Sequence, residues 1–170
     1  LVATSDLLML PVQLSAPSVP SRTVTIDNAS ASAHQLIHSD GFNTVFLELR
    51  VSAGALEAVD GTPVGPDGSV AVTLRAEPGR YGAELSPATL EFAAGESPTL
   101  VFAFGQYGDF AVADGSTRYA SRLDYEMALA LWREISPGQW QRVPGSGVQG
   151  VDEVAGRISA LGTFAVAAER

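Results

Sequence analysis

Apolar and polar side chains alternate with a period of two along much of the chain. The pattern is clearest in VFLELRV (residues 45–51), in SVAVTLR (residues 69–75), and at Leu100, Phe102 and Phe104. Successive side chains of a β-strand point to opposite faces, so this alternation predicts strands with one buried face and one solvated face. The chain is therefore expected to form sheets that cover each other's apolar faces.

Turn sequences separate these predicted strands. They combine glycine with aspartate or proline, which supply the positive φ or the fixed φ that tight turns need. They are Asp60-Gly61, Asp67-Gly68, Pro78-Gly79, Asp114-Gly115 and Pro137-Gly138. With 17 glycines and 10 prolines among short alternating segments, the sequence predicts an all-β protein. The expected fold is an antiparallel β-sandwich with an immunoglobulin-like or related two-sheet architecture.

The segment LDYEMALALWREI (residues 123–135) fits this pattern less well. Its residues are good helix formers, whereas its apolar side chains also alternate as in a strand. Pro137-Gly138, followed by Trp140 and Val143, is typical of the turn and return strand of a hairpin. We therefore expect residues 123–135 to form the first strand of that hairpin.

Residues 1–21 are expected to form an extended N-terminal arm, because prolines at positions 11, 17 and 20 disfavour a helix. The arm carries the apolar cluster Leu7, Leu8, Met9 and Leu10. This cluster either covers the domain's own core or binds a partner protein. Residues 22–170 are predicted to form a single β-sandwich domain with a long, glycine-rich loop at residues 105–122.

The chain is acidic. Its 10 basic residues, all of them arginine, are outnumbered by 19 acidic residues, which gives a formal net charge of -9. This charge repels phosphate backbones, so nucleic acid is not an expected partner. The arginines are scattered, and no basic patch is visible in the sequence. No apolar run approaches the roughly 20 residues of a membrane-spanning helix, so no transmembrane segment is expected.

The chain contains no cysteine, which excludes disulfides, thiolate metal sites and cysteine nucleophiles. It begins with Leu1 rather than methionine, as expected if an export signal has been removed. A periplasmic, cell-surface or extracellular location in a bacterium is therefore expected.

The only two histidines, His34 and His38, lie in the sequence HQLIHSD. Their spacing is that of the H-E-x-x-H zinc motif, but Gln35 replaces the glutamate that acts as general base. A strand would place the two imidazoles on one face, as a helix would. With Asp40 they are weak candidates for a metal site, since imidazole and carboxylate suit zinc or nickel. The favoured alternative is a pair of solvent-facing or hydrogen-bonded histidines, and a metal-dependent hydrolase is the least favoured function.

The sequence contains no G-x-S-x-G elbow, no P-loop and no G-x-G-x-x-G motif. No catalytic residue and no cofactor is therefore assigned. Aromatic residues gather instead in the C-terminal half of the chain. Within the predicted loop at 105–122, Tyr107, Phe110 and Tyr119 are candidates for contact with a partner protein or for stacking against a sugar.

Two stretches resemble the signatures of a known β-sandwich family, the spectrin-binding-like domain of ankyrins, netrin receptors and many bacterial exported proteins and lipoproteins. VSAGAL (residues 51–56) is similar to that family's aliphatic-Pro-x-Gly-Ala-Leu signature, with Ser52 where proline is usual. Downstream, LSP (residues 85–87), with Phe92 and PTL (residues 98–100), is similar to its second signature.

The C-terminal part extends the resemblance. Trp140 with Val143-Pro144, and ISALGTFAV (residues 158–166), resemble the closing strands of that family, although Gly162-Thr163 stands where the last strand often carries histidine. The resemblance covers roughly residues 43–168. It implies an all-β module that binds or spaces proteins and inherits no catalytic residues.

These observations favour a non-catalytic structural or protein-interaction module on the extracytoplasmic side of a bacterial membrane. An accessory, membrane-extrinsic subunit that stabilises a larger membrane or envelope complex, for example a respiratory or photosynthetic one, fits this class. Its expected partners are other proteins. The alternative is a β-sandwich that binds a carbohydrate or another small ligand.

Overall fold

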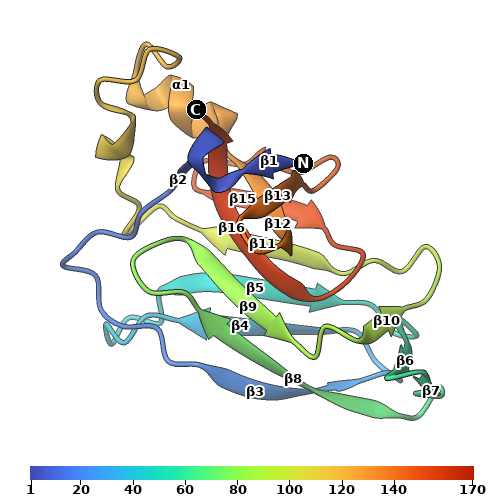
Figure 1. The fold of residues 1–170 in the computed structure, drawn as a ribbon. Helices are drawn as coiled ribbons and strands as arrows, with labels where there is room; N and C mark the ends of the chain where they lie inside the picture. Colours follow the sequence, from blue (N-terminus) through green and yellow to red (C-terminus); the bar gives the residue numbers. More distant parts are fainter.

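The computed structural model describes all 170 residues and confirms an all-β fold of antiparallel sheets (Figure 1). The larger sheet has the strand order β1-β13-β12-β16-β9-β8-β3, and β2 pairs with β16 outside this path. Its strands are β1 (Val2–Ala3), β2 (Leu7–Met9), β3 (Arg22–Asp27), β8 (Ser69–Ala76), β9 (Gly82–Ser86), β12 (Ala130–Ser136), β13 (Gln139–Arg142) and β16 (Gly162–Glu169).

The second sheet forms the other layer of the sandwich, with the order β14-β15-β11-β5-β4 (Figure 1). Its strands are β4 (Ser32–Ile37), β5 (Val45–Val51), β11 (Thr99–Ala103), β14 (Gly147–Gln149) and β15 (Glu153–Arg157). A small third sheet, of order β10-β6-β7, closes one end of the sandwich. It consists of β6 (Leu56–Val59), β7 (Thr62–Pro63) and β10 (Leu90–Phe92).

The predicted alternation sets the inner faces of the two sheets. Leu49 of β5, Val72 and Leu74 of β8, and Phe102 of β11 are fully buried, while the intervening Arg50 and Arg75 are exposed. These side chains belong to one continuous core of 32 buried residues. Burial of this apolar surface is the main stabilising contribution to the sandwich.

Residues 123–135, predicted as one strand, divide into a helix and a strand. Helix α1 (Arg122–Ala128) occupies the first half, and β12 starts at Ala130. Ser121 precedes the helix in an extended conformation, and its hydroxyl accepts a hydrogen bond from the Asp124 amide at 3.1 Å. This N-cap stabilises a helix start that the alternation of apolar residues conceals. The predicted hairpin is confirmed, since β12 pairs with β13 across Pro137-Gly138.

The helices of the protein are short. Besides α1, of seven residues, there are two 3₁₀ turns, η1 (Thr4–Asp6) and η2 (Phe110–Ala113). None of the helices has the length and apolar character of a membrane span. The predicted loop at 105–122 lies between β11 and α1 except for Arg122, which begins α1, and η2 is the only regular element between that strand and that helix.

Residues 1–21, predicted as an extended arm, contribute β1 and β2 to the larger sheet, with the 3₁₀ turn η1 between these two strands. β9 pairs with the first half of β16, and β2 pairs with the same edge of β16 further along, from Ala167 to Glu169. Leu10 continues this pairing, because its amide donates to the Val166 carbonyl oxygen at 2.9 Å. The N-terminal strand β2 and the C-terminal strand β16 thus lie side by side (Figure 1).

The structure brings together the two stretches that resemble family signatures. Phe92 of the second stretch pairs with Leu56 of the first in the small sheet, and the Ala93 amide donates to the Ala55 carbonyl oxygen at 2.9 Å. The turn between β5 and β6 uses Gly54 at φ 76°, a left-handed conformation that favours glycine.

Candidate binding surface at the loop end

Four segments meet at the end of the sandwich opposite the small sheet (Figure 1), and we call them the loop end: residues 12–19, 38–44, 76–79 and 105–109. Backbone hydrogen bonds join the arm to all three other segments. The Ser39 amide donates to the Ser18 carbonyl oxygen at 2.8 Å. The Gln13 amide donates to the Tyr107 carbonyl oxygen at 2.8 Å, and the Val12 amide donates to the Gly79 carbonyl oxygen at 3.1 Å. The Gln13 side chain also donates to Gly108 at 3.2 Å. The loop end is therefore an ordered surface built from distant parts of the chain.

Tyr107 connects the arm to the segment at 38–44. Its hydroxyl donates to Asp40 Oδ2 at 3.0 Å, while Asp40 Oδ1 accepts the Phe42 amide at 2.8 Å. Hydrogen bonds from Thr44, the Phe42 amide and Tyr107 lower the pKa of Asp40 to about 2. Burial, followed by the hydrogen bond to Asp40 and the charge of that carboxylate, raises the pKa of Tyr107. Asp40 thus organises the turn as a charged acceptor.

His38 lies behind this pair and is almost completely buried. Its ring is 4.5 Å from the ring of Tyr107 and 5.6 Å from that of Phe46, measured between centroids. Nδ1 is 3.0 Å from the Pro17 carbonyl oxygen. Because a carbonyl can only accept, Nδ1 carries the proton of this hydrogen bond. Nε2 is buried and has no hydrogen-bond partner in the protein.

His34 has a different environment. It lies in β4, where its Nε2 contacts the Ser32 hydroxyl at 2.9 Å, and a register shift separates Leu36 from Ile37 before His38 is reached. Burial and the nearby charge of Arg22 lower the pKa of His34. The weak metal candidates His34, His38 and Asp40 therefore have separate protein partners, and the structure contains no group of three His, Cys, Asp or Glu side chains arranged to hold a metal ion.

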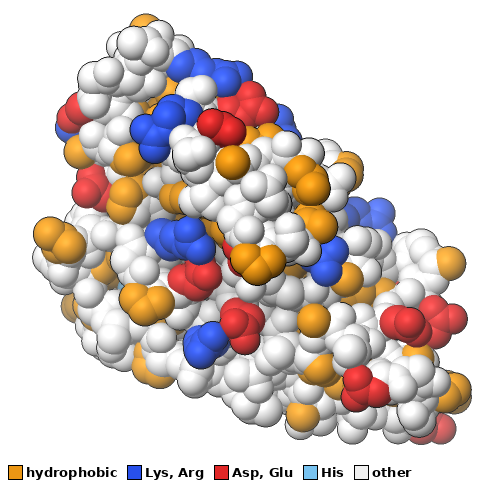
Figure 2. Space-filling model, viewed as in Figure 1, with side chains coloured by type: hydrophobic (Ala, Val, Ile, Leu, Met, Phe, Trp, Pro, Cys, Tyr) orange, Lys and Arg blue, Asp and Glu red, His pale blue; other side chains and the backbone are white.

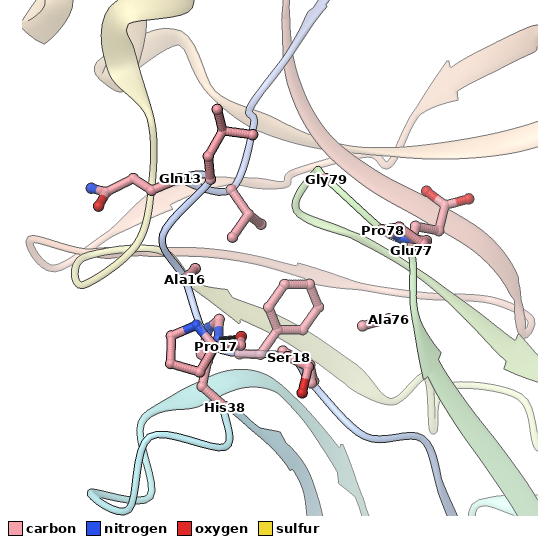
Figure 3. Close-up of a pocket in the computed structure, with 13 residues that line it drawn as sticks. Gln13, Ala16, Pro17, Ser18, His38, Ala76, Glu77, Pro78 and Gly79 are labelled. Atoms are coloured by element: carbon pink, nitrogen blue, oxygen red, sulfur yellow. Dashed lines mark hydrogen bonds between the residues drawn. The ribbon is translucent and has the colours of Figure 1, made fainter.

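A cavity of about 410 Å³ opens between the arm and the turn at 76–79. Figure 3 shows Ala16, Pro17 and Ser18 on one side of it and Ala76 to Gly79 on the other, with His38 beside Pro17. Phe46 and Val12 add to its apolar lining. The volume lies in the range of small-molecule sites, which are commonly about 300–1,000 Å³.

Two large apolar side chains of the loop end lie in solvent. Leu14, at the tip of the arm turn, is fully exposed, and Phe42 is 86% exposed. Both lie on turns that Tyr107 holds, through the Gln13 amide and through Asp40. The loop end carries the carboxylates Asp40, Glu77 and Asp109 but no arginine. On the face seen in Figure 2, its surface is mostly uncharged, with apolar side chains projecting from it.

The structure separates the three loop aromatics that the sequence grouped as binding candidates. Phe110 packs edge-on against Phe104 and Tyr125, with centroid distances of 5.6 and 6.4 Å. Tyr119 packs against Tyr125 and donates its hydroxyl to the Glu169 carbonyl oxygen at 2.6 Å. Of the three, only Tyr107 belongs to the loop end, so they do not form one stacking platform.

The apolar cluster of the arm is used within the chain. Leu8 and Leu10 belong to the main core, and Leu7 is buried on the outer face of the larger sheet with Trp132 and Trp140. Met9 is partly buried against the same outer cluster. These four residues are the predicted partner-binding candidates of the arm. They pack instead against the domain itself, which is the other of the two alternatives that the sequence leaves open for this cluster.

Sequence reasoning missed Leu14 and Phe42. Each is a single apolar residue in a polar or proline-rich stretch, so neither produces a periodic signal. A local signal does exist at Asp40, since aspartate two residues before the amide that it accepts is typical of an Asx turn.

Comparison with protein-family models, curated proteins and solved structures finds no match to this chain.

Proposed function

We propose that this chain is a non-catalytic protein-interaction module and that the loop end is its partner-binding surface. The observation that supports the proposal is the exposure of Leu14 and Phe42 on turns that hydrogen bonds hold in place. The proposed partner is another protein, with an apolar surface that covers these two side chains.

Order and exposure together favour binding. When a partner covers an exposed apolar side chain, the free energy of the complex falls, by roughly 1.5–3 kcal/mol for a fully covered leucine or phenylalanine. A turn that is already ordered loses little conformational entropy on association, so more of this free energy appears as affinity. Tyr107, Asp40 and Gln13 supply that order at the loop end.

The proposed setting is the outer side of a bacterial membrane, as an extrinsic subunit of a larger membrane or envelope complex. Support comes from the resemblance of residues 51–56 and 85–100 to a domain found in bacterial exported proteins. The acidic surface, with a formal net charge of -9, favours protein partners over anionic lipid headgroups or nucleic acid.

A capture experiment tests the loop end. The purified chain is immobilised and exposed to a detergent extract of the native cell envelope, and the retained protein is identified and purified. Replacing both apolar side chains, Leu14→Ser with Phe42→Ser, is expected to weaken binding of that purified protein at least tenfold. The matched control is Leu123→Ser with Met127→Ser, because these side chains of α1 are also exposed. Equal affinity of the two double variants would refute the role of the loop end.

Binding of a small ligand is the second candidate function, and the cavity of about 410 Å³ beside His38 favours it. The test is a thermal-shift and glycan-binding screen of the wild-type chain and of Ala16→Trp, a variant that places a large side chain at the cavity wall. A ligand of this cavity is expected to stabilise the wild type and not the variant. A ligand that stabilises both equally binds elsewhere.

A further inference from the structure

A second cavity, of about 210 Å³, lies at another place on the sandwich. The strands β12, β13 and β15 and the segment after β15 contribute its lining. It shares no residue with the loop end. Its most distinctive members are Arg133 of β12, Arg142 of β13 and Arg157 of β15.

The charges around this cavity are of one sign. Its lining contains three arginines and no aspartate or glutamate. The five ion pairs of the structure involve Arg50, Arg75, Arg80, Arg118 and Arg122, so none of the three lining arginines has a carboxylate partner. In a chain with a formal net charge of -9, three arginines without carboxylate partners around one cavity form a local positive site for an anion.

The hydrogen-bonding capacity of these arginines is largely unused within the protein. A guanidinium has five N–H donors. Each of the three makes one hydrogen bond, through Nη2 to a backbone carbonyl oxygen: Arg133 to Leu161, Arg142 to Ser146 and Arg157 to Gly95, all at 3.1 Å. The remaining donors have no acceptor within the protein.

Arg133 gives an independent indication of a missing acceptor. Its Nε is buried and has no hydrogen-bond partner. A buried charged donor without an acceptor is unfavourable, because it has lost its hydration without a replacement. An oxyanion in the cavity would supply acceptor atoms and a compensating charge at the same time.

Besides the arginines, the cavity lining contains apolar side chains and hydroxyl groups. Ile135, Val143, Ile158 and Phe164 contribute apolar surface, while Ser97 and Ser159 contribute hydroxyl groups. A ligand that matches this mixture has an anionic head and a small apolar body. The planar guanidinium fork fits a carboxylate in two parallel hydrogen bonds, and such charge-assisted bonds are stronger than neutral ones.

We propose that the cavity lined by Arg133, Arg142 and Arg157 binds a small organic carboxylate. The carboxylate accepts hydrogen bonds from the arginines, and its apolar body lies against the aliphatic and aromatic lining. This site goes beyond the proposed protein-interaction function and is independent of the loop end.

Titration with benzoate tests the proposal, with benzamide as the neutral analogue of the same shape and inorganic phosphate as the anion without an apolar body. The readouts are calorimetry and the ¹H–¹⁵N resonances of the arginine Nε groups. Benzoate is expected to bind and to shift the Arg133 Nε resonance, whereas benzamide has no effect. Stronger binding of phosphate than of benzoate would overturn the organic-acid assignment, and absence of benzoate binding would overturn the site.

Variants locate the binding. Arg133→Gln and Arg157→Gln are each expected to weaken benzoate binding at least tenfold. Arg75→Gln is the matched control, since it removes the same charge from an arginine that pairs with Glu84 outside this cavity.

Arg133→Lys keeps the charge but removes the planar fork, so an intermediate loss of benzoate affinity is expected from it. Arg157 is exposed, so its replacement keeps the test valid if Arg133→Gln unfolds. Unchanged affinity in Arg157→Gln together with Arg133→Lys would refute the proposal.

Discussion

Tyr107 donates its hydroxyl to Asp40 Oδ2 at 3.0 Å, although the two residues are 67 positions apart in the sequence. The same tyrosine accepts the Gln13 amide at its backbone carbonyl and covers the buried ring of His38. One residue therefore joins three segments of the loop end. Its removal is expected to loosen turns that are distant from it in the sequence.

The variant Tyr107→Phe tests this link. It keeps the ring contact with His38 and removes only the hydroxyl, so the fold should persist while the turn at 40–44 becomes more mobile. The measurement is amide hydrogen exchange at Phe42 and Gln13, and faster exchange is expected at Phe42. Tyr119→Phe, which removes a hydroxyl bound to the Glu169 carbonyl oxygen, is the control and should leave the Phe42 amide unchanged. Equal exchange rates in both variants would contradict the linking role.

Asp40 should make the loop end sensitive to acid. Its pKa in the folded state is lowered from 3.8 to about 2 by hydrogen bonds from Thr44, Phe42 and Tyr107. A lowered pKa means that the stabilisation is complete above the ordinary value and is lost as the pH falls through the folded value. Protection of the Phe42 amide is therefore expected to persist at pH 4 and to decrease toward pH 2. Chemical shifts of the Asp40 carboxyl carbon measure the midpoint, and a midpoint near 3.8 would disprove the assignment.

All four tyrosines should resist ionisation in the folded protein. Burial is the main cause that raises the pKa of Tyr81, Tyr107, Tyr119 and Tyr125. A raised pKa favours the neutral phenol, so the associated stability is present below the ordinary value of 10 and is lost as the pH rises through the folded values. The ultraviolet absorbance of phenolate is expected to appear above pH 10 in the native protein and near pH 10 in denaturant. Coincident titration curves would show that the prediction is wrong.

Two leucines of the arm should respond differently to the same substitution. Leu10 is fully buried and Leu14 is fully exposed. Leu10→Ala is expected to lower the free energy of unfolding by about 2–5 kcal/mol, since it leaves a cavity in the core. Leu14→Ala should change it by less than about 0.5 kcal/mol. Denaturant unfolding measures both, and similar small effects would mean that the arm does not contribute to the core.

The N-cap of α1 gives a smaller effect. Ser121 accepts the Asp124 amide and donates its hydroxyl to the Asp124 carboxylate at 2.9 Å. Ser121→Ala is expected to destabilise the protein by about 1 kcal/mol. The control is Ser30→Ala, at an exposed position in the turn between β3 and β4. Thermal unfolding compares the two variants, and a lower transition temperature is expected for Ser121→Ala than for Ser30→Ala. Equal transition temperatures would exclude a stabilising cap.

Local patterns predicted the strands well where one face of a sheet is solvated. The alternation in residues 45–51 and 69–75 corresponds to β5 and β8. The error at residues 123–135 has a local cause, because helix and strand follow each other without a glycine or proline between them. The sequence Ser121-Arg122-Leu123-Asp124 contains a signal for the start of the helix, a capping residue followed three positions later by an acidic one.

The candidate sites depend on contacts that no local pattern encodes. Arg133, Arg142 and Arg157 appear scattered in the sequence, and they line one cavity only because β12, β13 and β15 come together. Tyr107 was identified from its place in a glycine-rich segment, but its link to Asp40 depends on how two loops meet. Pairing of β2 with β16 likewise joins residues at opposite ends of the chain, a contact beyond the range of periodicity or turn chemistry.

Strand β16 occupies the interior of the larger sheet, between β12 on one side and β9 with β2 on the other. During synthesis on the ribosome, the earlier strands emerge first and lack this central neighbour. The arm and β9 can complete their hydrogen bonds only after the last strand has left the exit tunnel. The native sheet therefore forms after translation of β16, and until then the nascent chain exposes unpaired strand edges that a chaperone can bind.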